Sequence, residues 1–388
     1  MATVKSGRLI VAAILAILVY GMIAAMLGTL LPNLTARFHL TPEQNGNIAF
    51  AQALGLIIAS VSVGPLIDNR GKKTGLLLGL ALIAASLFAL PNSPSYEMIL
   101  VFIFMLGLGG GIIVTAANAL VSDINPERRS STLNLLNLFF GLGGLLTPLI
   151  GGQLLAGDAV SLCYLVAALT AVTLFVHITT GMPAPSGERG FKTSEMGGLL
   201  KKPTLWLLSL FLFLYVTCEC GVWNWLPKHL IAQGIPEKTA LTILSLGFAL
   251  GLLIGRLVVS RILIKVAPAT VTLGTSVLMA ITTYLALQTA DVTVAWIAVF
   301  CAGLAMAPVF PTTLGMTGDA FPKGTATAMG IVITCGWIGL AVSSKIIGAV
   351  AGGDDKNLKT ALLVLPAASV VMVLVNLALR PMLRRKTA

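Results

Sequence analysis

Residues Gly64 to Lys73 read Gly-Pro-Leu-Ile-Asp-Asn-Arg-Gly-Lys-Lys and form a short charged stretch between two long apolar ones. A fainter copy of this stretch recurs at Gly255 to Arg261, at an offset of 191 residues. Asp123 is matched in the same way by Asp319, at an offset of 196. Each offset is about half of the 388-residue chain, so the sequence indicates two repeated halves.

The composition is that of a membrane protein. Apolar residues make up 57% of the chain and charged residues only 10%, with a mean hydropathy of +0.96, whereas a soluble domain is about 25% charged. A membrane span needs roughly 20 apolar residues. The apolar stretches predict twelve spans, at residues 9–33, 44–67, 74–92, 98–122, 132–155, 159–181, 204–231, 239–262, 268–289, 292–320, 325–350 and 358–380.

The placement of the net charge of +11 predicts the topology. Most Lys and Arg residues fall in one set of loops, which includes both termini and the stretch 182–203, so the positive-inside rule predicts that these are cytoplasmic. The first span is longer than the apolar region of a signal peptide, and we expect it to be retained. We therefore expect a multi-pass protein of a bacterial inner membrane.

The polar stretch 182–203 separates six predicted spans from six. The sequence thus predicts an N-terminal six-helix bundle at 1–181, a cytoplasmic linker at 182–203 and a C-terminal six-helix bundle at 204–388. Repeated halves of this kind are typical of secondary transporters. The linker can either allow the halves to rock against each other or act only as a solvated tether.

Several function classes are disfavoured. The sequence has no Gly-x-x-x-x-Gly-Lys-Ser/Thr motif for an ATP-driven pump. His39, His177 and His229 are far apart, which does not resemble a metal site, and five cysteines within the predicted spans do not indicate disulfides. We expect no cofactor and no nucleic-acid partner. An integral-membrane enzyme remains a remote alternative.

The stretch Gly64 to Lys73 resembles the signature loop between spans two and three of the major facilitator superfamily. The resemblance implies an all-α membrane protein with two pseudo-symmetric six-helix bundles and a substrate site between them near the bilayer midplane. It also implies that Asp68 and Arg70 are gating residues. The carboxylate of Asp68 can pair with Arg70 or with the positive N-terminus of a neighbouring helix, and its alternative role is a topology-setting charge. Arg256, in the repeated stretch, is interpreted as a gating or topology residue near a cytoplasmic helix end.

Spans four, five, seven and ten are similar to the fucose, galactose and glucose proton symporter family. The matching segments are Gly107-Leu-Gly, Thr115-Ala-Ala-Asn118, Leu133-Asn134-Leu135, Gly143, Pro148, Tyr215-Val216 with Glu219, and Pro308-Val-Phe-Pro311-Thr312. The family's fucose transporters carry a carboxylate in span one and another in span four. This chain has no acid in span one, and Val114 stands four residues before Asn118, so proton coupling through those acids does not transfer.

Glu219 is the one carboxylate well inside a predicted span, about 15 residues from its start and so roughly 22 Å along the helix. Intramembrane ionisable groups are functional candidates by default. Glu219 can accept hydrogen bonds from sugar hydroxyls or carry a transported proton, and its alternative role is a structural acid paired with Lys345. Trp223 lies one turn later on the same face, with Asn224 beside it. Trp223 can stack on a sugar ring, or it can face lipid or pack in the core.

Other polar residues in the predicted spans need partners in hydrocarbon. We expect some to join helices and others to line the cavity, with Asn134 in the structural group. The predicted substrate-binding residues are Gln52, Asn118, Asn137, Glu219, Trp223, Asn224, Thr312 and Trp337, and the predicted ion-coupling residue is Glu219.

The sequence therefore predicts a secondary transporter of a neutral monosaccharide such as glucose or galactose, working as a monomer by symport with H⁺ or Na⁺. The rival hypothesis is an organic-anion or drug carrier, because the cation Lys345 lies about 20 residues into its span and could bind an anionic substrate. The exact substrate, the coupling ion and the direction of transport stay open at this point.

Overall fold

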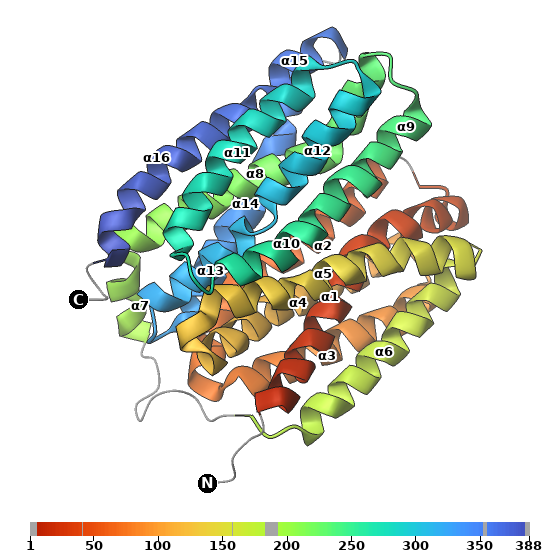
Figure 1. The fold of residues 1–388 in the computed structure, drawn as a ribbon. Helices are drawn as coiled ribbons and strands as arrows, with labels where there is room; N and C mark the ends of the chain where they lie inside the picture. Colours follow the sequence, from red (N-terminus) through yellow and green to blue (C-terminus); the bar gives the residue numbers. More distant parts are fainter. Residues whose placement is uncertain (1–5, 41, 157, 183–192, 352–354, 385–388) are drawn as a thin grey trace. The chain divides into compact units, whose positions relative to one another are not determined.

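The computed structural model describes residues 6–40, 42–156, 158–182, 193–351 and 355–384 (Figure 1). These residues form helices and short helical turns, with no strand among them. Long apolar runs favour helices in hydrocarbon, because a helix satisfies its backbone hydrogen bonds within one segment. The predicted all-α class is confirmed.

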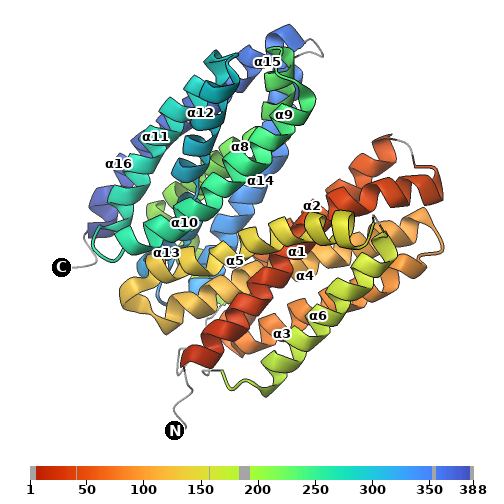
Figure 2. The same cartoon turned by 45° about the vertical axis from the view of Figure 1, so that its right-hand side comes forward.

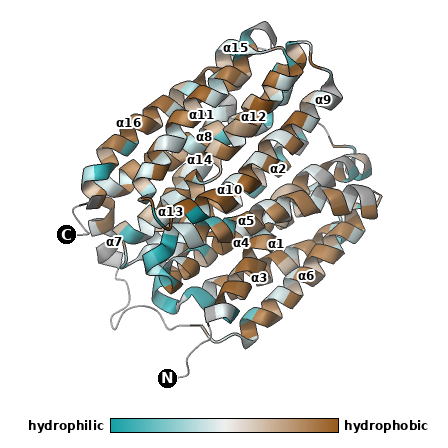
Figure 3. Cartoon of the chain, in the orientation of Figure 1, coloured by the Kyte–Doolittle hydropathy of each residue, from teal (hydrophilic) through white to brown (hydrophobic). Residues whose placement is uncertain are grey.

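Eleven helical segments among the described residues are long and apolar enough to cross a membrane, and they match eleven of the twelve predicted spans. The helix α5 (Arg129–Leu149) and the π-helical turn η3 (Ile150–Leu154) occupy the place of the remaining one, 132–155. Apolar residues, drawn in brown, predominate along the helices (Figure 3).

The chain divides into two compact units, and each unit includes one segment from the other half of the sequence. Unit 1 comprises residues 1–125, 136–196 and 321–334, and unit 2 comprises residues 126–135, 197–320 and 335–388. The start of α5 thus belongs to unit 2, and the start of α14 (Thr325–Ala351) belongs to unit 1. The bundle limits 1–181 and 204–388 stay a prediction.

Unit 1 contains most of α5 and η3 together with α1 (Ser6–Phe38), α2 (Pro42–Arg70), α3 (Lys72–Ala89), η1 (Leu90–Asn92), α4 (Tyr96–Ile124) and α6 (Ala159–Thr179). Within it, α2 packs on α4, and α3 packs on both α4 and α6 (Figure 2). One close approach uses Gly107, where an added Cβ atom would lie closer than 3.0 Å to the Gln52 carbonyl oxygen of α2. Small residues allow such close packing of membrane helices.

Unit 2 contains η2 (Pro126–Arg128), α8 (Pro203–Ala232), α9 (Glu237–Thr242), η4 (Ile243–Ala249), α10 (Leu250–Ile262), α11 (Pro268–Gln288), α12 (Val292–Met306), α13 (Val309–Ala320), α15 (Asp355–Leu362) and α16 (Val364–Arg384), with most of α14. The helix α16 packs on α8 and α11, and α12 packs on α10 and α11. The stretch η4 is π-helical, a rare geometry that is frequent at functional sites.

The predicted linker 182–203 is described only in part. Residues 183–192 lie outside the described residues, and α7 (Thr193–Leu200) follows them as a short helix. The Trp206 indole N–H of α8 donates a hydrogen bond to the Leu200 carbonyl at 2.7 Å, which ties the end of α7 to α8.

The close approach of α4 to α2 yields a test of the packing. We expect Gly107→Ala to lower the melting temperature of the detergent-solubilised protein by several degrees, because the new methyl group meets backbone rather than a movable side chain. Gly274→Ala in α11 is the matched control, since nothing lies within 4 Å of its added Cβ and alanine favours helix. Equal melting temperatures for the two variants would contradict this packing.

Candidate functional site

The carboxylate of Asp68 binds the N-terminus of α14 within unit 1. Its Oδ1 accepts a hydrogen bond from the Ala326 N–H at 3.1 Å, and its Oδ2 accepts from the N–H and the hydroxyl of Thr327 at 2.8 and 2.7 Å. The first N–H groups of a helix lack partners within it and carry positive charge, so a carboxylate there is stabilising. Of the two partners that the sequence allowed for Asp68, the structure shows the helix N-terminus.

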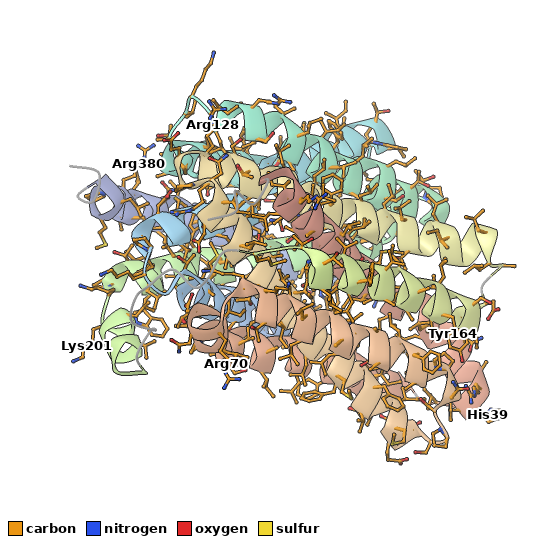
Figure 4. The ribbon with its side chains drawn as sticks, turned by 90° about the horizontal axis from the view of Figure 1, so that it is seen from below. His39, Arg70, Arg128, Tyr164, Lys201 and Arg380 are labelled. Atoms are coloured by element: carbon orange, nitrogen blue, oxygen red, sulfur yellow. The ribbon has the colours of Figure 1, made fainter. Side chains whose placement is uncertain are left out.

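Two glycines of the charged stretch shape this contact. A Cβ atom at Gly64 would come within 3.0 Å of the Thr327 backbone, so only glycine lets α2 approach α14 so closely. Gly71 has φ 92°, in the left-handed region that glycine adopts without strain, and it separates α2 from α3. Arg70, one residue earlier, is exposed at the opposite end of unit 1 from His39 and Tyr164 (Figure 4).

The two acids related by the repeat pair differently. Asp123 forms an ion pair with Lys72 at 2.7 Å, within its own half of the sequence. Asp319 instead pairs with Arg129, a residue of the other half, within unit 2. Ser131 adds a hydrogen bond to the Ser260 carbonyl at 2.6 Å. These contacts hold the start of α5 in unit 2.

Three predicted binding residues in unit 1 are buried and hydrogen-bonded. The Gln52 amide donates to the Ile23 carbonyl at 3.3 Å. The Asn118 amide donates to the Val114 carbonyl at 2.7 Å, and its oxygen accepts from the Asn137 amide at 2.9 Å. Asn118 therefore joins α4 to α5. In this arrangement these amides act between helices, and their role in substrate binding stays a prediction.

Thr312 of α13 is also fully buried. Its hydroxyl accepts a hydrogen bond from the Asn134 amide at 3.0 Å, within unit 2. The same amide donates to the Ser130 carbonyl at 2.8 Å. This contact agrees with the structural role expected of Asn134.

Glu219 lies in a cluster of polar and aromatic side chains within unit 2. Tyr215 and Trp223 stand one turn before and one turn after it on α8, so the three share a helix face. The Tyr215 hydroxyl interacts with the Glu219 carboxylate, although the pair does not reach ordinary hydrogen-bond geometry. The charge of Arg256 from α10 acts on the same carboxylate.

Arg256 lies six residues before the end of α10 and is buried, with only 5% of its surface exposed. Its role in gating or topology stays a prediction. Its interaction with the acid deep in α8 was missed, because the sequence does not show which faces of two spans meet. The i, i+4 spacing of Tyr215, Glu219 and Trp223 was the available signal for the α8 face.

Trp223 is the tryptophan on the same helix face as Glu219. Trp223 packs edge-on against Phe248 of η4, with ring centroids 5.3 Å apart, and still exposes 38% of its surface. Asn224 beside it is exposed. The indole nitrogens of Trp225 and Trp337 are buried, and neither has a hydrogen-bond partner among the described residues.

Lys345 belongs to α14, but its side chain lies outside the described residues.

Comparison with known proteins places the chain in a family. Residues 13–344 match the Major Facilitator Superfamily. The chain belongs to this superfamily of transporters. It is therefore a multi-pass membrane transporter rather than an enzyme, as predicted.

Among curated relatives, the glucose/galactose transporter of Brucella abortus strain 2308 is 25% identical over 352 residues, which cover 86% of this chain and 85% of the relative. Bypass of stop codon protein 6 of Saccharomyces cerevisiae is 23% identical over 381 residues, covering 88% and 76%.

Two solved structures share the fold. The Escherichia coli fucose:proton symporter FucP has a TM-score of 0.82 at 20% identity, covering 95% of this chain and 98% of its own. The human organic anion transporter MFSD10 has a TM-score of 0.79 at 15% identity, covering 96% and 99%. At these identities the likeness shows the fold alone.

The contact of Asp68 with α14 yields a second test. We expect Asp68→Asn to raise hydrogen–deuterium exchange in a peptide covering residues 324–330, because the neutral amide loses the attraction to the helix N-terminus, worth about 0.3–2 kcal/mol. Arg70→Gln should leave that exchange unchanged, since Arg70 is exposed. If Arg70→Gln exposes the peptide as much as Asp68→Asn does, the partner assigned to Asp68 is wrong.

Proposed function

We propose that this protein is a secondary transporter of a neutral monosaccharide, glucose or galactose in kind, coupled to H⁺ or Na⁺. The observation that carries the proposal is the Glu219 cluster, in which an acid deep in a span stands one turn from Trp223 and beside Tyr215. The similarity to a glucose/galactose transporter supports the same substrate class.

The chemistry of the cluster suits a sugar. A carboxylate accepts hydrogen bonds from hydroxyl groups, and such charge-assisted bonds are stronger than neutral ones. The C–H face of a pyranose packs on an indole ring, for which the exposed part of Trp223 is available. We propose Trp337 of α14 as a further binding residue, because its buried indole N–H has no hydrogen-bond partner among the described residues and can donate to a sugar oxygen.

The acid also gives the transporter a means of ion coupling. A carboxylate in hydrocarbon is costly unless it is paired, protonated or bound to a cation. Arg256 supplies one such partner, and a transported proton or sodium ion supplies another. We propose that Glu219 alternates between these partners during transport. The excess of basic residues in one set of loops supports a bacterial inner-membrane location with both termini cytoplasmic.

One observation favours a second candidate function, the organic-anion carrier. A buried guanidinium near Glu219 could bind a substrate carboxylate when Glu219 is protonated. The fold likeness to an organic anion transporter is compatible with it. In that case small organic anions, and not glucose, would raise the melting temperature of the solubilised protein.

The coupling role of Glu219 can be tested in proteoliposomes loaded with and without glucose. We expect Glu219→Gln to abolish uphill glucose accumulation under an ion gradient, since the amide carries no charge to be neutralised, while sugar exchange across the membrane continues. Glu97→Gln is the control, because Glu97 is exposed in the first turn of α4. Uphill accumulation that survives in Glu219→Gln would remove Glu219 from coupling.

A further inference from the structure

The span that contains α12 and α13 is interrupted between Met306 and Val309. Prolines explain the interruption. In a continuous helix the N–H groups of residues 308 and 311 would donate to the carbonyls of Leu304 and Ala307. Residues 308 and 311 are both proline, which has no N–H, so these two carbonyls lose their helical donors inside the membrane.

The helix α10 packs directly on this interruption. Gly255 faces it, because an added Cβ atom there would come within 3.0 Å of the Leu304 carbonyl oxygen and the Ala307 side chain. The next residue, Arg256, donates a hydrogen bond from Nε to the Ala307 carbonyl at 3.4 Å. Arg256 thus supplies a donor to a carbonyl that Pro311 leaves without one.

The same side chain interacts with α8. The charge of Arg256 acts on Glu219 and also on Tyr215, one turn earlier. A guanidinium has five N–H groups, so the bond to Ala307 leaves others for further partners. All these residues belong to unit 2. One buried cation therefore links the intramembrane acid to the interrupted helix.

We propose that Arg256 is a positioning residue that couples the charge of Glu219 to the geometry of the α12–α13 interruption. While Glu219 is charged, its attraction holds the guanidinium where Nε reaches the Ala307 carbonyl. When Glu219 is neutralised, the guanidinium loses its counter-charge and the interruption loosens. The transport role of this link rests on the proposed function, but the link itself is a property of the protein without substrate.

The structure offers a contrasting, static role for Arg256. If Arg256 only satisfied the Ala307 carbonyl, the interruption would depend on Arg256 and not on Glu219. Neutralising the acid alone separates the two roles, because Glu219→Gln removes the charge and leaves both α10 and the prolines intact.

The test is hydrogen–deuterium exchange of the full chain in lipid nanodiscs, in peptides covering residues 303–316, followed until wild-type deuterium uptake is measurable. We expect Glu219→Gln and Arg256→Gln each to raise the exchange rate in these peptides by at least about twofold, since local opening controls exchange. Exchange in the double variant should not exceed that of the faster-exchanging single variant, because both substitutions act through one link. Glu97→Gln should match the wild type.

Arg256→Lys gives a further check should Arg256→Gln fail to fold. It keeps the charge near Glu219 but loses the planar guanidinium, so its exchange should lie between the wild type and Glu219→Gln. Wild-type exchange in Glu219→Gln would overturn the proposal. Because the exchange is measured without sugar, the test of Arg256 stays valid even if the protein does not transport glucose.

Discussion

A charged side chain inside a membrane-spanning bundle needs an opposite charge or a hydrogen-bond partner. In unit 2, Glu219 is such a side chain. The charge of Arg256 from α10 acts on this acid, and Tyr215 stands one turn before it on α8. Ionisable groups inside a membrane are costly and are functional candidates by default. The same guanidinium reaches the Ala307 carbonyl at the proline interruption, so electrostatic compensation and backbone satisfaction are joined in one side chain.

Charges at helix ends also have partners of opposite sign. Asp68 compensates the N-terminus of α14 in unit 1, and Arg129 pairs with Asp319 in unit 2. The two acids related by the repeat therefore have different kinds of partner. Asp123 pairs with Lys72 of its own half of the sequence, whereas Asp319 pairs with Arg129 of the other half. The two halves thus resemble each other in sequence but differ in how these acids are paired. Arg129 lies in residues 126–135, a segment of the N-terminal half that belongs to unit 2.

The spans could be predicted from sequence because hydrocarbon imposes a length and a composition on each of them, and the Asp68 contact was one of two partners expected. The partners of Asn118 and of Arg256 could not be predicted in this way. Asn118 was predicted to bind substrate, a role that stays a prediction, and its hydrogen bond from Asn137 could not be foreseen because the local sequence of one span does not identify the span that it contacts. The bond from Arg256 to the Ala307 carbonyl, which lacks a helical donor because of Pro311, became visible only in the packing of α10 on this segment.

Coupled sugar transport is tested by uptake of labelled glucose and, separately, labelled galactose into proteoliposomes under an inward proton gradient, an inward sodium gradient, and neither. We expect accumulation above the external concentration with one of the two gradients, which would also identify the coupling ion. Equilibration that depends on neither gradient would contradict coupling and leave Glu219 with substrate binding alone. Absence of glucose and galactose uptake under all three conditions would contradict the sugar assignment and favour the organic-anion carrier.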